Sequence, residues 1–148
     1  MRGEHGFTLV ELLITVALTG ILASVVGPSI SQIVNVTEYG DDRLLALHEL
    51  QNTASWFSLD GQMAVSAVGG SGLTLTLPTT QTITYTLAGT NLTRNDGVNP
   101  VKTLAQNISS VSYTVNGRLV TMNLTSAPTG RMGVSEQGTY VVYLRSVP

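Results

Sequence analysis

The 148-residue sequence contains no cysteine and few charged residues. Without cysteine there are no disulfides, thiolate metal sites, iron–sulfur clusters or cysteine nucleophiles. Charged residues make up only 11% of the chain, and seven Lys plus Arg against nine Asp plus Glu give a formal net charge of -2. No overall basic field exists to hold the phosphates of a nucleic acid. The length allows one ordinary domain beside a membrane segment, which excludes a multidomain enzyme.

Motifs for catalysis and cofactor binding are also absent. The sequence has no Gly-x-Ser-x-Gly elbow, no His-Glu-x-x-His and no phosphate-binding loop. Asp41 and Asp42, or Asn95, Asp96 and Asn99, could place hard oxygens around calcium, but Asn and Asp gather in turns for backbone reasons alone. We therefore expect no enzyme activity, no cofactor and no metal site.

The N-terminal part carries a long apolar run. Between Phe7 and Val36 the only charged residue is Glu11. The 24 residues from 7 to 30 would span about 36 Å as a helix, against a hydrocarbon core of about 30 Å. The six residues before the run are too few and too weakly basic for a secretory signal, so the segment is expected to stay in the protein. Arg2 favours a cytoplasmic N-terminus and an outer C-terminal part.

The start of this run resembles a known processing motif. Gly6-Phe7-Thr8-Leu9-Val10-Glu11-Leu12-Leu13 is similar to the cleavage and methylation motif of type IV prepilins and type II secretion pseudopilins. The resemblance implies a leader at 1–6, removed by prepilin peptidase between Gly6 and Phe7, and N-methylation of Phe7. It also implies that 7–36 forms a transmembrane and assembly helix.

Two residues of the helix are candidate assembly residues. A glutamate in an apolar helix costs several kcal/mol unless it is neutralised, and the resemblance implies that the N-terminal amine of a neighbouring subunit neutralises Glu11. The alternative is a carboxylate close enough to the membrane surface to reach water. Gly27-Pro28 interrupts the helical hydrogen-bond ladder, so a kink or an unwound stretch is expected there; a tolerated membrane proline is the alternative.

The remainder, 37–148, is predicted to be an outer pilin-like domain. An amphipathic helix is expected over 38–60. Its apolar stripe consists of Leu44, Leu47, Leu50, Ala54 and Phe57. The charged residues Asp41, Asp42, Arg43 and Glu49 are expected on the opposite faces. Gly69 to Gly72 is expected to be a flexible join, followed by an antiparallel sheet of five to seven strands over 73–146. Alternating runs begin at Leu73, Ile83 and Val111, and Asn116-Gly117 predicts a tight hairpin turn.

The predicted fold class is thus α+β: a long N-terminal helix, membrane half plus amphipathic half, packed on a C-terminal antiparallel sheet. The pattern of the sheet part is similar to minor pseudopilins of the J type. Many of the major pilins that the chain resembles close a C-terminal loop with a cysteine pair, which this chain lacks. The resemblance therefore favours a minor, initiating or accessory subunit over the bulk filament subunit.

Three function classes follow. The first is a structural subunit of a type IV pilus or type II secretion pseudopilus, in the bacterial inner (cytoplasmic) membrane as a single pass and then in a filament. Its partners would be other pilin or pseudopilin subunits, prepilin peptidase and an inner-membrane assembly platform. The alternative is a ligand-binding minor pilin for adhesion or DNA uptake; DNA itself is not expected, since only a cluster such as Arg94, Lys102 and Arg118 could serve. The third is a bitopic membrane protein unrelated to filaments.

Overall fold

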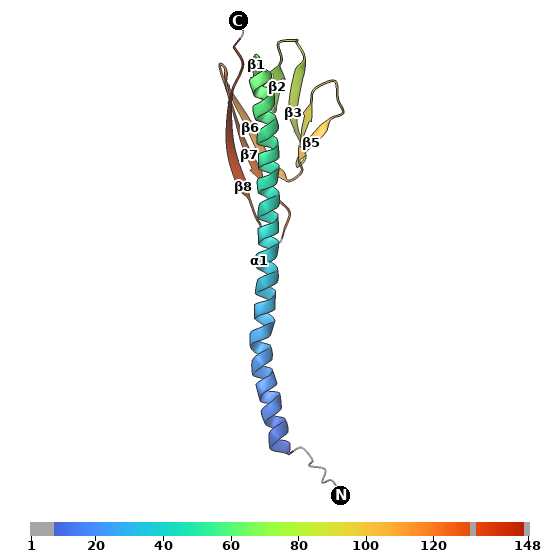
Figure 1. Cartoon of the computed structure of the whole chain (residues 1–148), viewed down its shortest axis with the longest axis vertical. Coiled ribbons are helices and arrows are strands. Elements are labelled where there is room, and N and C mark those ends of the chain that lie inside the picture. The colour runs from blue at the N-terminus through green and yellow to red at the C-terminus, as the bar shows by residue number, and fades with distance from the viewer. Residues whose placement is uncertain (1–7, 131–132, 147–148) are drawn as a thin grey trace. The chain divides into compact units, whose positions relative to one another are not determined.

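The computed structural model of the protein describes residues 8–130 and 133–146. The chain divides into two compact units, Met1–Glu38 and Tyr39–Pro148, and each is described by itself. One helix, α1 (Leu9–Met63), supplies the first unit and the helical part of the second (Figure 1). The second unit adds antiparallel sheets, so the α+β class, a long N-terminal helix packed on antiparallel strands, is confirmed.

In the first unit the helix exposes its apolar side chains on all sides. The run is long and apolar enough to cross a membrane. A helix that is apolar all round needs an apolar environment, because its own unit has nothing to bury it against.

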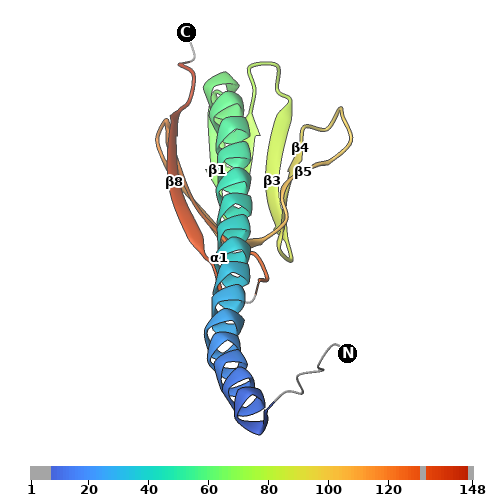
Figure 2. The same ribbon diagram turned by 60° about the horizontal axis from the view of Figure 1, so that its bottom comes forward.

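The second unit holds two sheets. A five-stranded sheet has the order β1-β2-β3-β4-β5 and a three-stranded sheet the order β6-β7-β8, all pairs antiparallel. The helical part of this unit lies lengthwise against the two sheets (Figures 1 and 2). The described residues thus form eight strands rather than the expected five to seven: β1 Ser66–Gly69, β2 Gly72–Thr76, β3 Thr82–Ala88, β4 Asn91–Asn95, β5 Lys102–Ala105, β6 Ile108–Asn116, β7 Leu119–Ser126 and β8 Glu136–Tyr143.

The glycine-rich segment between helix and sheet is not a flexible join. Gly69 is the last residue of β1 and pairs with Leu73, so Gly70, Ser71 and Gly72 form the turn of a hairpin. Gly72 is required there, because a Cβ at this position would lie 2.6 Å from the carbonyl oxygen of Tyr85. The sequence reasoning missed β1 because its four residues are too few to show an alternation.

The tight turn after β6 is confirmed, with one change. Asn116 pairs with Leu119, which leaves Gly117 and Arg118 as the two turn residues. Gly117 has φ of +61°, and glycine at the first central position is the requirement of a type II′ turn. Asn116 therefore ends the strand and does not supply a positive φ.

The buried stripe of the helix matches the predicted one only in part. Leu50 and Phe57 are buried in one core with strand residues such as Leu75 and Ile83, whereas Leu44 is 58% exposed. Three polar side chains share the buried stripe: Glu49, Thr53 and Asp60. The prediction that Glu49 faces away from the sheet is therefore wrong, because buried hydrogen-bond partners compensate for its charge.

Candidate functional site

The first candidate site is the N-terminal end of α1. The Thr8 hydroxyl oxygen accepts a hydrogen bond from the backbone N–H of Glu11 at 3.3 Å, and the Thr8 carbonyl accepts one from Leu12 at 3.2 Å. Thr8 is thus the N-cap of the helix, and Thr8-x-x-Glu11 has the spacing of a capping box. The cap explains why the helix begins at Leu9.

Glu11 is exposed in the first turn of this helix. Within residues 8–130 and 133–146 no cation pairs with its carboxylate. The positive end of the helix dipole favours an acidic group here, by about 0.3–1 kcal/mol at exposed sites. That is less than the cost of a charge in hydrocarbon, which is several kcal/mol. Gly6 and Phe7, the predicted cleavage and methylation residues, lie outside the described residues.

Pro28 lies inside an unbroken α-helix. The expectation of an unwound stretch at Gly27-Pro28 is therefore not met. Ser29 and Ser31 follow the proline, and their hydroxyls donate to the carbonyls of Val25 and Gly27. Side-chain hydroxyls elsewhere along the run do the same, so the hydroxyl groups of its serines and threonines are satisfied within the helix, as a lipid environment requires.

The second unit holds a buried charged cluster that sequence reasoning missed. The fully buried Asp60 carboxylate accepts hydrogen bonds from the Arg94 Nε at 2.7 Å and Nη2 at 2.9 Å. It also accepts one from the Tyr85 hydroxyl at 2.5 Å. Burial, and then the hydrogen bond to Asp60, raise the pKa of Tyr85 well above its ordinary value. The hydrogen bond to Asp60 is also the main cause that raises the pKa of Arg94.

The same arginine connects this cluster to the surface. Arg94 Nη1 donates to Asp96 at 3.0 Å, and the Arg94 guanidinium carbon lies 4.9 Å from the centroid of the Trp56 ring. The Lys102 amine lies 4.0 Å from the same centroid. The sole tryptophan of the chain is therefore in contact range of two cations.

The loop after β4 bears on the calcium hypothesis. Asp96 accepts hydrogen bonds from the backbone N–H groups of Val98 and Asn99 and from the Asn99 side chain. These hydrogen bonds, those to Asn99 first, lower the pKa of Asp96 well below its usual range. The carboxylate oxygens are thus used to form the turn. In the part of the chain that the structure describes, no three His, Cys, Asp or Glu side chains gather as metal ligands.

Glu49 forms the second buried polar connection between helix and sheet. One carboxylate oxygen accepts from the backbone N–H groups of Gln106 and Asn107 and from the Asn107 side chain. The other accepts from the Ser126 hydroxyl at 2.6 Å. Four donors from two segments of the sheet part therefore converge on one helix side chain.

The basic residues considered for a ligand surface do not form one cluster. Arg94 is bound to Asp60 and Asp96. The Arg118 guanidinium donates to the Leu144 carbonyl, where it closes the end of the three-stranded sheet. Only Lys102 presents an amine without an acidic partner among the described residues. No signal in the sequence separates these cases, because Asp60 lies 34 residues from Arg94 and Leu144 lies 26 residues from Arg118.

Comparison with known proteins gives one match. Residues 1–27 match the family described as the prokaryotic N-terminal methylation motif, and the chain carries this signature of type IV prepilins. No curated protein and no solved structure matches the chain.

Proposed function

We propose that the protein is a structural subunit of a type IV pilus or a type II secretion pseudopilus, processed by prepilin peptidase and assembled through its N-terminal helix. One observation carries the proposal. The methylation motif of residues 1–27 includes the start of an apolar helix whose first turn holds Glu11, which is exposed and has no cation partner among the described residues. The motif is common to both systems, so the proposal names neither a system nor a subtype.

Processing would supply the missing cation. Cleavage between Gly6 and Phe7 creates an α-amino group, which is largely protonated at neutral pH. We propose that this amine pairs with the Glu11 carboxylate of another chain and not with that of its own. A neighbour displaced along the filament can present its amine to this Glu11. Because each unpaired charge is expensive in an apolar setting, the pairing specifies the register of the two helices.

The proposed partners and location follow from this mechanism. The leader end faces prepilin peptidase on the cytoplasmic side, and the apolar helix crosses the inner membrane once. An assembly platform in that membrane then transfers the subunit to the filament, where its neighbours are other pilin or pseudopilin subunits. Pro28 lies in the assembly helix, where we propose that it is tolerated without an unwound stretch.

The alternative is a ligand-binding minor pilin for adhesion or DNA uptake. It requires a free recognition surface on the second unit. Arg94 and Arg118 are both engaged in internal hydrogen bonds, which gives no support to a phosphate-binding surface. We therefore favour the structural role.

The test compares Glu11→Val with Thr15→Val. Thr15 lies one turn further on and its hydroxyl donates only to the carbonyls of Glu11 and Leu12, so it is a matched polar control. We expect both variants to be cleaved, with mature chains of 142 residues, since six of 148 are removed. Only Glu11→Val should lose co-purification with the other filament subunits.

The outcomes separate two questions. Intact mass reports processing: a dominant species that retains Met1 to Gly6 in a host with active peptidase would contradict the family-level role. Co-purification reports assembly: if Glu11→Val is incorporated as well as Thr15→Val, the carboxylate is an interfacial group and the pairing mechanism is wrong.

A further inference from the structure

The two sheets leave two outer strands, β5 and β8, and the two differ in how they are protected. β1 and β6 cover one another, since a Cβ at Gly69 of β1 would contact Tyr113 and Val115 of β6. β5 has four residues, begins with Lys102 and pairs with β4 through a register shift. The carbonyl of its Leu104 also accepts a hydrogen bond from Asn52 of α1 at 2.6 Å. These features protect a sheet edge against further pairing.

β8 has none of these protections. It has eight residues, pairs with β7 without a register shift, and contains neither lysine nor proline. Its one charged residue, Glu136, is at the start of the strand and pairs with Arg43. A long, regular edge of this kind is a template for another strand.

The register identifies the backbone groups that this edge presents. The Leu144 N–H donates to the Arg118 carbonyl, in line with the register that pairs Leu119 with Tyr143. Since hydrogen-bonded pairs alternate along an antiparallel ladder, even-numbered residues of β8 bond to β7 and odd-numbered residues point outward. The Arg145 N–H, the next odd residue, indeed points away from β7 and donates to the Ala64 carbonyl of the chain itself. The free edge therefore consists of Gln137, Thr139, Val141 and Tyr143.

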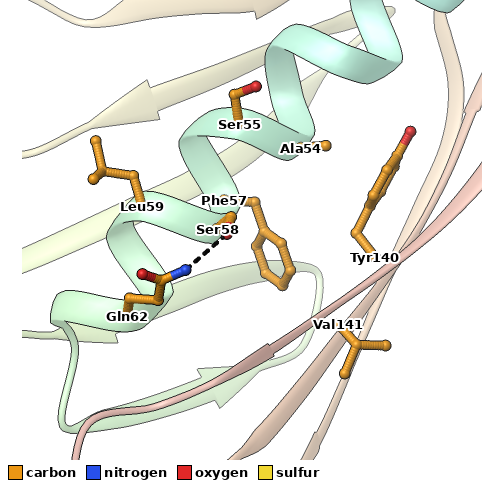
Figure 3. Close-up of a pocket in the computed structure, with 8 residues that line it drawn as sticks. All are labelled: Ala54, Ser55, Phe57, Ser58, Leu59, Gln62, Tyr140 and Val141. Atoms are coloured by element: carbon orange, nitrogen blue, oxygen red, sulfur yellow. Dashed lines mark hydrogen bonds between the residues drawn. The ribbon is translucent and has the colours of Figure 1, made fainter.

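A groove runs beside this edge (Figure 3). It has a volume of about 510 Å³ and lies between the Ala54 to Gln62 part of α1 and Tyr140 and Val141 of β8. All eight lining residues are uncharged, and Leu59 and Val141 are about half exposed. A strand added to β8 would place every second side chain over this groove, because side chains alternate between the faces of a sheet.

A second copy of the chain that pairs antiparallel with this edge does not fit in a common membrane. β8 runs in the same direction as α1, because Glu136 contacts Arg43 at one end and Val142 packs on Gly61 near the other. Two β8 strands paired antiparallel about a two-fold axis would therefore direct their α1 helices in opposite directions. The protected β5 of another copy cannot pair either. This step uses the membrane-anchored orientation and so rests on the proposed function.

We propose that β8 and the groove beside it bind an extended segment of a different filament subunit by strand addition. The segment is uncharged over the residues that face the groove, since the groove offers no charge to pair with. Main-chain hydrogen bonds to the four odd residues supply affinity, and the groove selects alternate side chains.

The experiment measures residue-resolved amide exchange of the full-length chain in detergent, alone and in the complex purified with its co-expressed filament subunits. Amides of even residues in β8 are protected in both states by β7. We expect the amides of Thr139 and Val141 to exchange fast in the isolated chain and roughly tenfold or more slower in the complex. Strand addition slows exchange only at the odd residues of β8, and this alternation distinguishes it from a contact made by side chains.

The matched variants are Thr139→Pro and Thr139→Ala. Proline removes the outward N–H and leaves the ladder to β7 intact, so it is tolerated at an edge position. Alanine removes the same side chain and keeps the N–H. We expect Thr139→Pro to reduce co-purified subunits roughly tenfold, equivalent to about 1.4 kcal/mol, while Thr139→Ala binds as the unchanged chain does.

Three results would overturn strand addition of a different subunit at β8. The amides of the odd residues could exchange as fast in the complex as in the isolated chain, or Thr139→Pro and Thr139→Ala could bind the subunits equally well. The isolated chain could also show the same slowing of exchange as its concentration rises, which would indicate self-pairing. Failure of the proposed function looks different. In that case the unchanged chain retains its leader and enters no complex at all.

Discussion

Gly61 allows α1 and β8 to approach closely, and Gly61→Ala tests this packing. A Cβ at this position would lie 2.5 Å and 2.8 Å from the two methyl groups of Val142 and 3.1 Å from its Cβ. Rotation of a β-branched side chain cannot clear three such contacts, so the backbones must separate. Overpacking of this kind typically costs about 1–3 kcal/mol.

The helix propensity of alanine works in the opposite direction, which a matched control can measure. Gly40 lies in the same helix, and a Cβ there would meet nothing within 4 Å. Gly40→Ala should therefore stabilise the protein by up to about 1 kcal/mol. The same chemical change at Gly61 should destabilise it by up to about 2 kcal/mol once a gain of about 1 kcal/mol is subtracted from the packing cost.

The assay is urea unfolding of the full chain in detergent, followed by the fluorescence of the sole tryptophan, Trp56. Linear extrapolation gives the free energy of unfolding of each variant. The double variant Gly61→Ala with Val142→Ala should be more stable than the sum of the single effects predicts, because the contact is gone. If Gly61→Ala stabilises as much as Gly40→Ala, or the double variant shows no coupling, then the close packing of α1 on β8 is wrong.

Three further predictions concern the polar connections and use the same unfolding assay. Tyr85→Phe should lower the free energy of unfolding by about 1.5 kcal/mol or more, because it removes a hydrogen bond to the charged Asp60. Because the pKa of Tyr85 is raised in the folded state, its contribution to the stability of the fold is complete below about pH 10 and is lost as the pH rises above that value. Tyr85→Phe should therefore lose less stability in alkali than the unchanged chain does. Because the pKa of Asp96 is lowered in the folded state, this carboxylate stabilises the fold above about pH 4, and that stabilisation is lost as the pH falls. Asp96→Asn should therefore make the free energy of unfolding less dependent on pH in acid. An unchanged dependence would contradict the turn contacts of Asp96. Glu49→Ala should cost about 2–4 kcal/mol, because it leaves several donors without an acceptor, and a loss under 0.5 kcal/mol, ordinary for a surface residue, would contradict the buried role.

The sequence predicts the features that depend on short-range patterns. An apolar run without charges predicts a helix, alternating Leu and Thr predict half-buried strands, and Asn116-Gly117 predicts the tight turn that follows β6. The start of the helix is also local, because Thr8 and Glu11 are three residues apart. Each of these features depends on residues that are close together in the chain.

The features that sequence reasoning missed depend on distant partners. Periodicity and charge place Glu49 on the outer face of the helix, because an unpaired carboxylate is not buried, and neither signal indicates a partner for Asp60. Their partners are 57 and 34 residues further along the chain, and no local pattern announces them. The apolar stripe was predicted correctly at Leu50 and Phe57, which are buried, and wrongly at Leu44, which is exposed.

These polar contacts also explain how one alignment of helix and sheet is selected. The alternation of Leu and Thr in β2 and β3 repeats every two residues, and a helical stripe nearly repeats when the helix slides by one turn, about 5.4 Å. Apolar burial alone therefore distinguishes these alignments weakly. A slide of one turn would remove Asp60 from Arg94 and Glu49 from Ser126. An uncompensated buried charge costs about 3–5 kcal/mol, so the two carboxylates penalise each wrong alignment strongly, while the apolar contacts supply most of the stability of the correct one.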